Sequence, residues 1–434
     1  MISRNRQLSI LNNLILGLAI IILGIIVIVG SINIYTKVIN LFVYIFIIIG
    51  LSELGNFLLK KKIVRNFQVL LRIILNIVLG FIMLLFPKIP LSILPIVFSL
   101  YLLFNAIVKF INYLILLEVN LKSRFKELFF SLFFLIFCFI FLIYPLNYLN
   151  VFIMLIGIYC LMYGLNRIYQ FLLDVLTKKY KLKIKNKIRI TLPALFEAFI
   201  PKRELNTINK DLDSLVTDDG ESIKDSDLSI FIHLSNYGFN QFGHMDIMFD
   251  KKIYSYGNYD KSSQKLFTAI GDGVLFELTN KQEYIKFCIE NSKKTIVEFG
   301  IKLTKQQKEK LGRNLVNIKN DSEEWYPLIK QGVSKKQWSK DYSSKLYKAT
   351  KANFYKFKNG IYKKYFVLGI NCTYFIDMLL RNNVFEVLKR VGIISPGTYY
   401  EYLDELYNKR CYNVVSKKIY TKENVGDMFD KNKE

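Results

Sequence analysis

A cysteine and a histidine in the second half of the chain stand where nucleophilic chemistry needs them. Cys372 opens an apolar, helix-like stretch directly after a Gly-containing turn, in the run GINCTYF. A thiol at a helix N-terminus faces the positive end of the helix dipole and unsatisfied N–H groups, which lower the thiol pKa and offer an oxyanion site. His244 opens a strand-like stretch after a Gly-rich segment, in FGHMDI, and a nearby imidazole can take the thiol proton. We therefore expect Cys372 and His244 to form a nucleophile–base pair.

A third, polar residue is needed to orient the imidazole. The runs HMDIMFD and KKIYSYGNYD are typical of two strands joined by a tight turn. If the chain turns at Asp250–Lys252, Tyr256 and Asn258 fall on the same face as His244. We expect Asn258 to accept the ring N–H, with Tyr256 as the next choice. The lack of a clearer orienting residue leaves open a domain that binds without catalysis.

The other histidine and the remaining cysteines indicate no further site. His233 lies in an apolar strand-like run, IFIHLS, and we interpret it as a structural or supporting group. Cys288 and Cys411 have no acid–base partner in their sequence context. Two histidines in the whole chain exclude a His-rich metal site, and five scattered cysteines make no disulfide framework. No phosphate-binding loop, dinucleotide fingerprint or metal-ligand cluster is present, so we expect no cofactor and no metal.

The surrounding sequence predicts an α+β domain over 228–434. Helices are expected over Lys281–Asn291 and Thr304–Ile318, on either side of the strand TIVEFGIKL, and an amphipathic helix over Thr373–Val391. Thr304, followed three residues later by Gln307, fits a capping box. A domain of this size can bury its own core.

Apolar runs fill the first part of the chain and predict an all-α membrane domain over 1–176. The whole chain is 52% hydrophobic, and its net charge of +25 is unevenly spread: residues 1–176 hold 14 Lys/Arg and 4 Asp/Glu. Each run approaches the length that crosses a bilayer core as a helix. The six predicted spans are Leu11–Ile32, Val38–Leu59, Phe67–Phe86, Leu91–Leu117, Leu128–Leu146 and Val151–Leu176.

The six spans pair into three similar hairpins. Phe86-Pro87 and Tyr144-Pro145 lie 58 positions apart, and at the same offset Ala106 matches Gly164. Small residues at repeated positions allow helix backbones to approach closely in lipid. This pattern resembles the HdeD-like acid-resistance membrane family, whose members are six-span proteins built from such hairpins.

Loop charges predict the orientation of the spans. Nine basic residues lie at the N-terminus and in the second and fourth links, against two in the first and third links. The positive-inside bias therefore places the N-terminus, the even links and the C-terminal domain in the cytoplasm. Glu53, Arg72 and Lys109 lie within spans at scattered depths, and Arg167 and Asp174 lie near the end of the last span; we interpret them as locally paired or snorkelling rather than as an ion path.

A basic segment joins the two parts, within a connecting region over 177–227. Residues 178–189 hold seven basic residues in twelve, and a short amphipathic stretch follows, with Leu192, Leu195 and Phe199 at helical spacing. We expect residues 178–204 to bind anionic lipid headgroups. No nucleic-acid recognition motif accompanies the basic residues, so we expect no nucleic-acid partner.

Five short motifs in the second half carry a second resemblance. They are FGHMDI (242–247), YSYGNYD (254–260), GDGVLF (271–276), KLTKQQKEKL (302–311) and NCTYFIDMLL (371–380). In this order they resemble the Lnb-type N-terminal domain family, which looks like a circularly permuted relative of the NlpC papain-like enzymes. The resemblance implies a permuted papain-like fold in which the His strand precedes the Cys helix, with Cys372 as nucleophile and His244 as general base.

Two functional hypotheses follow. The first is a membrane-anchored cysteine hydrolase or acyltransferase that acts on an amide or ester near the cell membrane. The second is a non-catalytic membrane stress-response or ligand-binding protein. The sequence leaves the substrate unknown and is compatible with a homo-oligomer.

Overall fold

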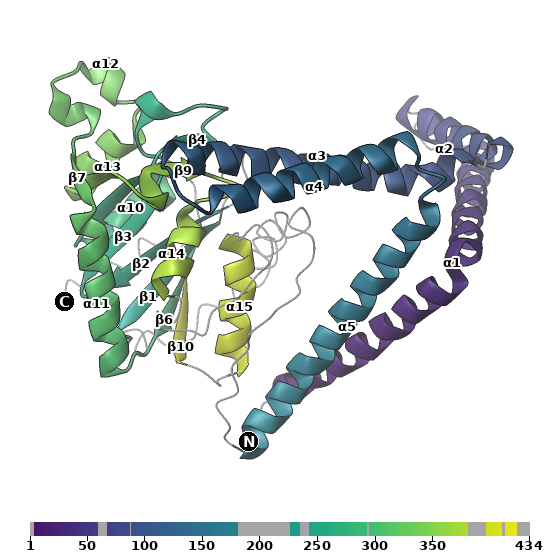
Figure 1. Cartoon of the computed structure of the whole chain (residues 1–434), viewed down its shortest axis with the longest axis horizontal. Coiled ribbons are helices and arrows are strands. Elements are labelled where there is room, and N and C mark those ends of the chain that lie inside the picture. The colour runs from purple at the N-terminus through teal and green to yellow at the C-terminus, as the bar shows by residue number, and fades with distance from the viewer. Residues whose placement is uncertain are drawn as a thin grey trace. The chain divides into compact units, whose positions relative to one another are not determined.

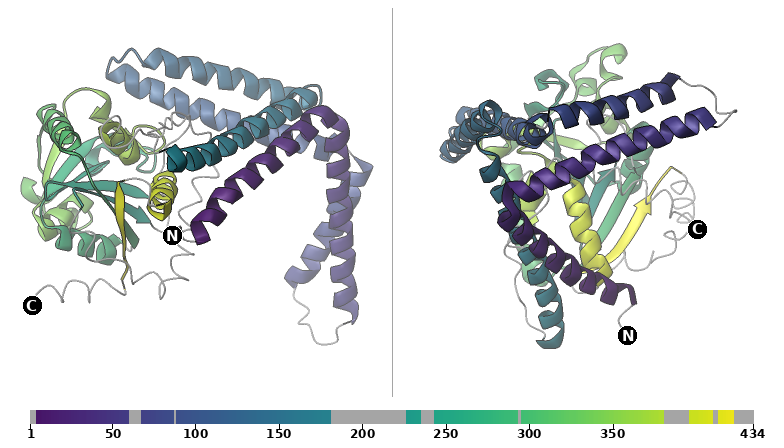
Figure 2. Two further views of the ribbon diagram at one scale, coloured as in Figure 1. Left: turned by 90° about the horizontal axis from the view of Figure 1, so that it is seen from below. Right: turned by 90° about the vertical axis from the view of Figure 1, so that its right-hand side faces the viewer.

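The structure is a computed structural model, and it describes residues 4–59, 67–86, 88–180, 226–234, 243–292, 295–380, 396–409 and 413–422. The predicted amphipathic stretch after the basic run, and the linker up to residue 225, lie outside these ranges. By their contacts the residues group into two compact units, Met1–Ile111 with Phe125–Lys183 and Asn112–Arg124 with Ile184–Glu434. Long helices dominate the first unit, and the second contains a β-sheet with helices (Figures 1 and 2).

The N-terminal region consists of apolar helices. They are α1 (Arg4–Leu59), α2 (Phe67–Leu85), α3 (Lys88–Glu118), α4 (Arg124–Ile143) and α5 (Leu149–Tyr180). Among the described residues, four stretches are long and apolar enough to cross a membrane: Tyr35–Gly55, Leu91–Glu118, Arg124–Ile143 and Leu149–Tyr169. Two further apolar stretches, Leu14–Gly30 and Leu70–Leu85, are shorter. A helical, membrane-compatible N-terminal region is thus confirmed. That the chain has six membrane spans stays a prediction.

The link expected between the first two spans is helical. Both predicted spans lie in α1, which is 56 residues long and bends along its course (Figure 2). The link, Asn33–Lys37, contains neither Pro nor Gly, so nothing in its sequence ends a helix.

Glycines bring α1 and α5 close together. A Cβ on Gly24 would lie 3.0 Å from the Gly157 carbonyl oxygen, and one on Gly164 would lie 2.8 Å from that of Gly17. Gly55, by contrast, has no neighbour within 4 Å of such a Cβ. Backbones at this separation leave no room for larger side chains, as is typical of helix pairs in lipid.

Glu53, Arg72 and Lys109, which lie within predicted spans, are each paired. Arg72 Nη2 lies 3.0 Å from Glu53 Oε1, and Lys109 Nζ lies 2.9 Å from Glu127 Oε2. Each pair joins two helices that are consecutive in the chain, which agrees with local pairing.

The second unit is built on an eight-stranded antiparallel sheet with the order β10-β6-β1-β2-β3-β5-β8-β7. Its strands are β1 (Leu228–Leu234), β2 (His244–Phe249), β3 (Lys252–Gly257), β5 (Val274–Leu278), β6 (Thr295–Ile301), β7 (Ser322–Trp325), β8 (Asn353–Phe357) and β10 (Val414–Tyr420). A separate two-stranded sheet pairs β4 (Ile270–Asp272) with β9 (Lys364–Phe366). This antiparallel sheet domain confirms the α+β prediction, while its papain-like character stays a prediction.

Helices cover both faces of the large sheet (Figure 1). On one face α14 packs against β2 and β3, where the ring of Phe375 stacks on Tyr256 at 5.0 Å. On the other face Tyr284 of α10 packs edge-on against Phe276 at 5.7 Å. The helices of this unit are α10 (Lys281–Ser292), α11 (Lys305–Asn320), α12 (Lys335–Trp338), α13 (Tyr342–Thr350), α14 (Cys372–Leu380) and α15 (Pro396–Lys409).

Two local predictions can be checked directly. The capping box of α11 is present, because Gln307 N donates to Thr304 Oγ1 at 3.3 Å and Thr304 N donates to Gln307 Oε1 at 2.8 Å. The helix expected over Thr373–Val391 is described as α14 to Leu380, and its remainder lies outside the described residues.

Candidate active site

Cys372 is the first residue of α14, and its neighbour caps that helix. The Asn371 side chain accepts a hydrogen bond from Tyr374 N at 2.9 Å and donates one to the Val367 carbonyl oxygen at 2.9 Å. This N-cap fixes the start of the helix and the course of the chain that leads to it. Cys372 itself is only 2% exposed.

His244 is the first residue of β2, at the point where β2 and β3 separate. β2 pairs with β1 along its whole length, so that His244 lies opposite His233, but it pairs with β3 only from Ile247 to Phe249. From His244 to Asp246, the edge of β2 that faces β3 is therefore not paired with that strand. There the Met245 N–H and the His244 imidazole lie close enough to the Cys372 thiol to lower its pKa. The structure thus brings the two predicted residues together.

The two groups stabilise each other's charge. Burial alone would raise the pKa of the Cys372 thiol, but the His244 imidazolium and the Met245 N–H lower it below its ordinary value. Burial would likewise lower the pKa of His244, but the Cys372 thiolate and the Asp246 carboxylate raise it to about 10. Both shifts favour a thiolate–imidazolium pair at neutral pH.

The Asp246 carboxylate lies beside the imidazole. Its Oδ1 lies 2.9 Å from His244 Nε2, and the Ser255 Oγ and Tyr259 OH oxygens lie 2.8 and 2.9 Å from the same nitrogen. With Nε2 in contact with these three oxygens, Nδ1 is the ring nitrogen left to exchange a proton with the thiol. Asp246 is fully buried and therefore acts from a fixed position.

The same carboxylate binds the second histidine. His233 Nε2 lies 2.6 Å from Asp246 Oδ2, and Tyr284 OH donates to that oxygen at 2.5 Å. Burial would raise the pKa of Asp246, but His244 and His233 hold it well below its usual range. Both histidines of the chain thus meet at one carboxylate, and His233 has the supporting position expected of it.

The two residues predicted to orient His244 bond elsewhere. Tyr256 OH donates to the carbonyl oxygens of Tyr362 and Lys364, each at 3.1 Å, and Asn258 Nδ2 donates to the Thr268 carbonyl oxygen at 3.1 Å.

The cause is the length of the hairpin turn. Phe249 pairs with Lys252, so the turn has two residues, Asp250 and Lys251, with φ of 49° and 60°. The three-residue turn assumed from the sequence shifts the register by one position, and such a shift exchanges the two faces of a strand. In the actual register Ser255, not Tyr256, shares a face with His244 and Asp246.

Two further residues near the thiol were not predicted. The sequence could have indicated Asp246, because it stands two positions after His244 on a strand and so lies on the same face of the sheet. Nothing in the sequence indicated Tyr365; its hydroxyl lies near the Cys372 thiol. Burial and the nearby thiolate raise the pKa of Tyr365 well above its ordinary value, so its hydroxyl stays protonated.

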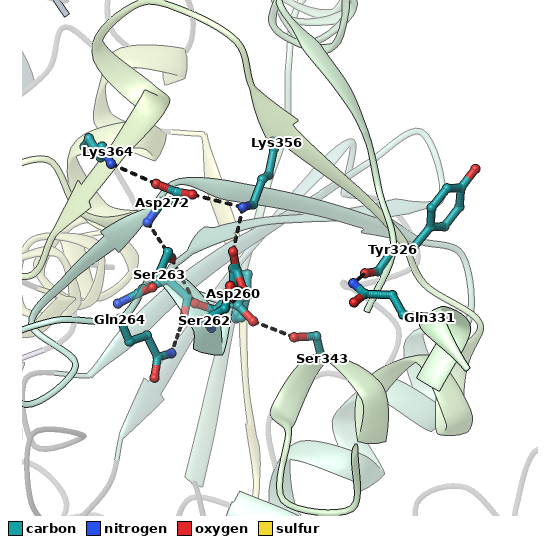
Figure 3. A network of polar contacts seen from close by, with 12 residues as sticks. Asp260, Ser262, Ser263, Gln264, Asp272, Tyr326, Gln331, Ser343, Lys356 and Lys364 are labelled. Atoms are coloured by element: carbon teal, nitrogen blue, oxygen red, sulfur yellow. Dashed lines mark hydrogen bonds and ion pairs between the residues drawn. The ribbon is translucent and has the colours of Figure 1, made fainter. Parts of the chain in front are cut away.

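A polar network fixes the segment that carries Tyr259 (Figure 3). Ser343 Oγ donates to the Tyr259 carbonyl oxygen at 2.5 Å. Lys356 Nζ lies 2.5 Å from Asp260 Oδ2 and 2.9 Å from Asp272 Oδ2. These contacts connect the segment after β3 to β8 and α13, and they support the position of the Tyr259 hydroxyl beside His244.

Cys288 is a core residue of this unit. It is fully buried with Tyr284 and Phe276, and Cys411 lies outside the described residues. Within the described ranges, no three His, Cys, Asp or Glu side chains are arranged to hold a metal ion.

Comparison with known proteins assigns part of the N-terminal region. A family model described as a short repeat of unknown function, DUF308, matches residues 71–143. This range covers most of α2 and all of α3 and α4, and it supports the likeness of this part to the HdeD-like membrane family. No curated protein and no solved structure matches the chain.

Proposed function

We propose that the chain is a membrane-anchored cysteine hydrolase or acyltransferase that acts on an amide or ester near the membrane. The observation that carries the proposal is the row Cys372–His244–Asp246, in which a thiol at a helix N-terminus meets an imidazole oriented by a buried carboxylate. This is the nucleophile–base–orienting arrangement of thiol hydrolases. The resemblance of the five motifs to the permuted NlpC papain-like enzymes agrees with it.

The reaction proceeds in two steps. The Cys372 thiolate attacks the carbonyl carbon and forms a C–S bond, while the His244 imidazolium gives its proton to the leaving amine or alcohol. In the second step His244 takes a proton from water, or from an acceptor alcohol or amine, which attacks the thioester and releases the thiolate. Asp246 keeps the imidazole in the required orientation in both steps.

The oxyanion that forms at the carbonyl oxygen requires hydrogen-bond donors. The protonated Tyr365 hydroxyl lies at the thiol, and the first turn of α14 adds the positive end of its dipole. Both are fixed before substrate binds, because Asn371 caps the helix and β9 holds Tyr365.

We further propose that the chain crosses the cell membrane six times with both termini in the cytoplasm, and that residues 178–204 bind anionic lipids. The unequal loop charges and the basic run support this arrangement. A site held at the bilayer in this way favours a lipid, a lipid-linked molecule or the tail of a membrane protein as substrate.

Formation of an acyl-enzyme tests the proposed activity. The purified full-length protein would be incubated with a panel of p-nitrophenyl acyl esters, and modified peptides would be identified by mass spectrometry. We expect a thioester at Cys372 and ester turnover that Cys372→Ala abolishes and Cys288→Ala leaves unchanged. Turnover unaffected by Cys372→Ala would refute the proposal.

The exposure of the thiol favours a second candidate. At 2% exposure, Cys372 presents almost no surface to an incoming carbonyl group. A non-catalytic domain of a membrane stress-response protein, which binds a ligand without cleaving it, fits that observation. The absence of an acyl-enzyme together with saturable ligand binding would select this alternative.

A further inference from the structure

A tight loop after the short helix η2 (Lys261–Ser263) presents two apolar side chains to solvent. Lys265 and Ile270 pair through both backbone hydrogen bonds, at 2.8 and 3.2 Å, and residues 266–269 form the turn between them. Leu266 is 59% exposed and Phe267 is 87% exposed. In the described part of the sheet domain, the other exposed large apolar or aromatic side chains lie singly, at Val316, Tyr326 and Val415.

The backbone of this loop is fixed in an uncommon conformation. Leu266, Phe267 and Thr268 have φ of 48°, 54° and 71°, a region that non-glycine residues rarely adopt. Three contacts hold it: Ala269 N donates to the Leu266 carbonyl oxygen, Asn258 Nδ2 to that of Thr268, and Val367 N to that of Ala269. Strained conformations persist where the surrounding structure determines them, and they concentrate at functional positions.

Basic residues flank the apolar tip. Lys261 and Lys265 are exposed, and neither forms an ion pair with a residue that the structure describes. Apolar side chains next to unpaired lysines are typical of segments that enter the headgroup region of an anionic membrane.

We propose that the Leu266–Phe267 loop inserts into the anionic surface of the bilayer that the N-terminal helices cross. Two side chains and two lysines are far too small a surface for a stable protein interface, which buries about 800 Å² on each partner. They suffice to enter a bilayer surface, because the apolar helices of the same chain, which are long enough to cross a bilayer, would already hold the chain there. The inference does not depend on the proposed catalysis.

Insertion of this loop would bring the segment that leads to Cys372 close to the lipid surface. The Ala269 carbonyl oxygen accepts a hydrogen bond from the backbone N–H of Val367. Val367 lies in the short segment between β9 and Cys372. The loop and the nucleophile are thus connected through one backbone contact and a few residues of chain.

A depth measurement on the full-length protein in nanodiscs tests the inference. Phe267→Trp would be compared with Val316→Trp, an exposed position on α11, and the emission of the wild-type tryptophans would be subtracted. The nanodiscs would contain phosphatidylglycerol and either ordinary or brominated phosphatidylcholine. Because interfacial segments lie about 5–10 Å into the headgroup and acyl boundary, we expect brominated lipid to quench the tryptophan introduced in the loop at least about twofold more than the one introduced on α11.

Two results would overturn the inference. One is equal quenching of the two introduced tryptophans. The other is a blue-shifted emission from the Phe267→Trp variant without quenching by brominated lipid, which would indicate that protein covers the loop. Leu266→Trp provides a second probe if the first variant does not fold, and the same twofold difference is expected there.

Discussion

At the scale of single residues, the candidate chemistry depends on one buried carboxylate. Asp246 contacts His244 through one oxygen and His233 through the other. A buried charge is costly unless it is paired, so the two histidines and Tyr284 are what allow Asp246 to stay ionised. The ionised carboxylate in turn keeps His244 protonated beside the thiolate. The charge on His244 is therefore stabilised from two sides, by the thiolate and by the Asp246 carboxylate.

Asp246→Asn tests this dependence. The amide keeps the shape of the side chain but loses the charge, so the imidazolium loses one of the two charges that stabilise it and the ring orientation changes. We expect the rate of acyl-ester turnover to fall about 10²-fold or more, as is typical when the group orienting a catalytic imidazole is lost. The matched control is Asn258→Ala, because Asn258 bonds to Thr268 rather than to His244. A larger loss in the control than in Asp246→Asn would show that the orienting residue has been misassigned.

At the scale of elements, the sequence predicts what local patterns determine. The capping box of α11, the strand pair β2–β3 and the helix start at Cys372 follow from short runs of residues, and the structure has them. The orienting residue was mispredicted, because it depends on whether the turn has two residues or three, and Asp250-Lys251-Lys252 allows both. Contacts such as that of Tyr284 with Asp246 join residues 38 positions apart, and no local pattern reports them.

The packing of α1 against α5 gives a prediction at this scale. Gly24→Leu would force a side chain into the space occupied by Gly157 and Cys160, since a Cβ there already lies within 3.1 Å of both. We expect the variant to lose about 1–3 kcal/mol of stability, the usual cost of overpacking, and to unfold at a lower temperature in detergent. Gly55→Leu is the matched control and should melt like the wild type, because its Cβ meets no neighbour within 4 Å. Equal melting temperatures for the two variants would contradict the α1–α5 contact.

At the scale of the whole molecule, an apolar helical region and a charged sheet domain share one chain. Residues 1–176 carry few acidic residues, and most of the acidic residues of the chain lie after them. The match to the DUF308 family model, over residues 71–143, lies in the first part, and the candidate thiol site lies in the second. The proposed activity uses both parts: the helices would anchor the chain in the membrane, and the sheet domain carries the candidate site.

The proposed orientation is testable in cells. A peptide tag placed after Glu434 should resist a protease added to intact cells and be digested once the membrane is permeabilised. The expectation rests on the nine basic residues of the N-terminus and even links, against two on the opposite side. Digestion of the tag in intact cells would place the sheet domain outside and require an extracellular substrate.

The most direct test of the central claim is the pH dependence of iodoacetamide labelling at Cys372, followed by mass spectrometry in the wild type and in His244→Ala. The thiolate is the form that reacts, so a thiol pKa lowered by His244 moves the onset of labelling to lower pH. We expect the wild-type rate to be already high at neutral pH and nearly constant up to about pH 9, since His244 keeps its proton until about pH 10. In His244→Ala burial still raises the thiol pKa and outweighs the remaining Met245 N–H, so labelling should be slow at neutral pH and rise above the ordinary thiol value of about 8.5. Identical profiles for the two proteins, both rising through that ordinary range, would contradict an activated Cys372–His244 pair.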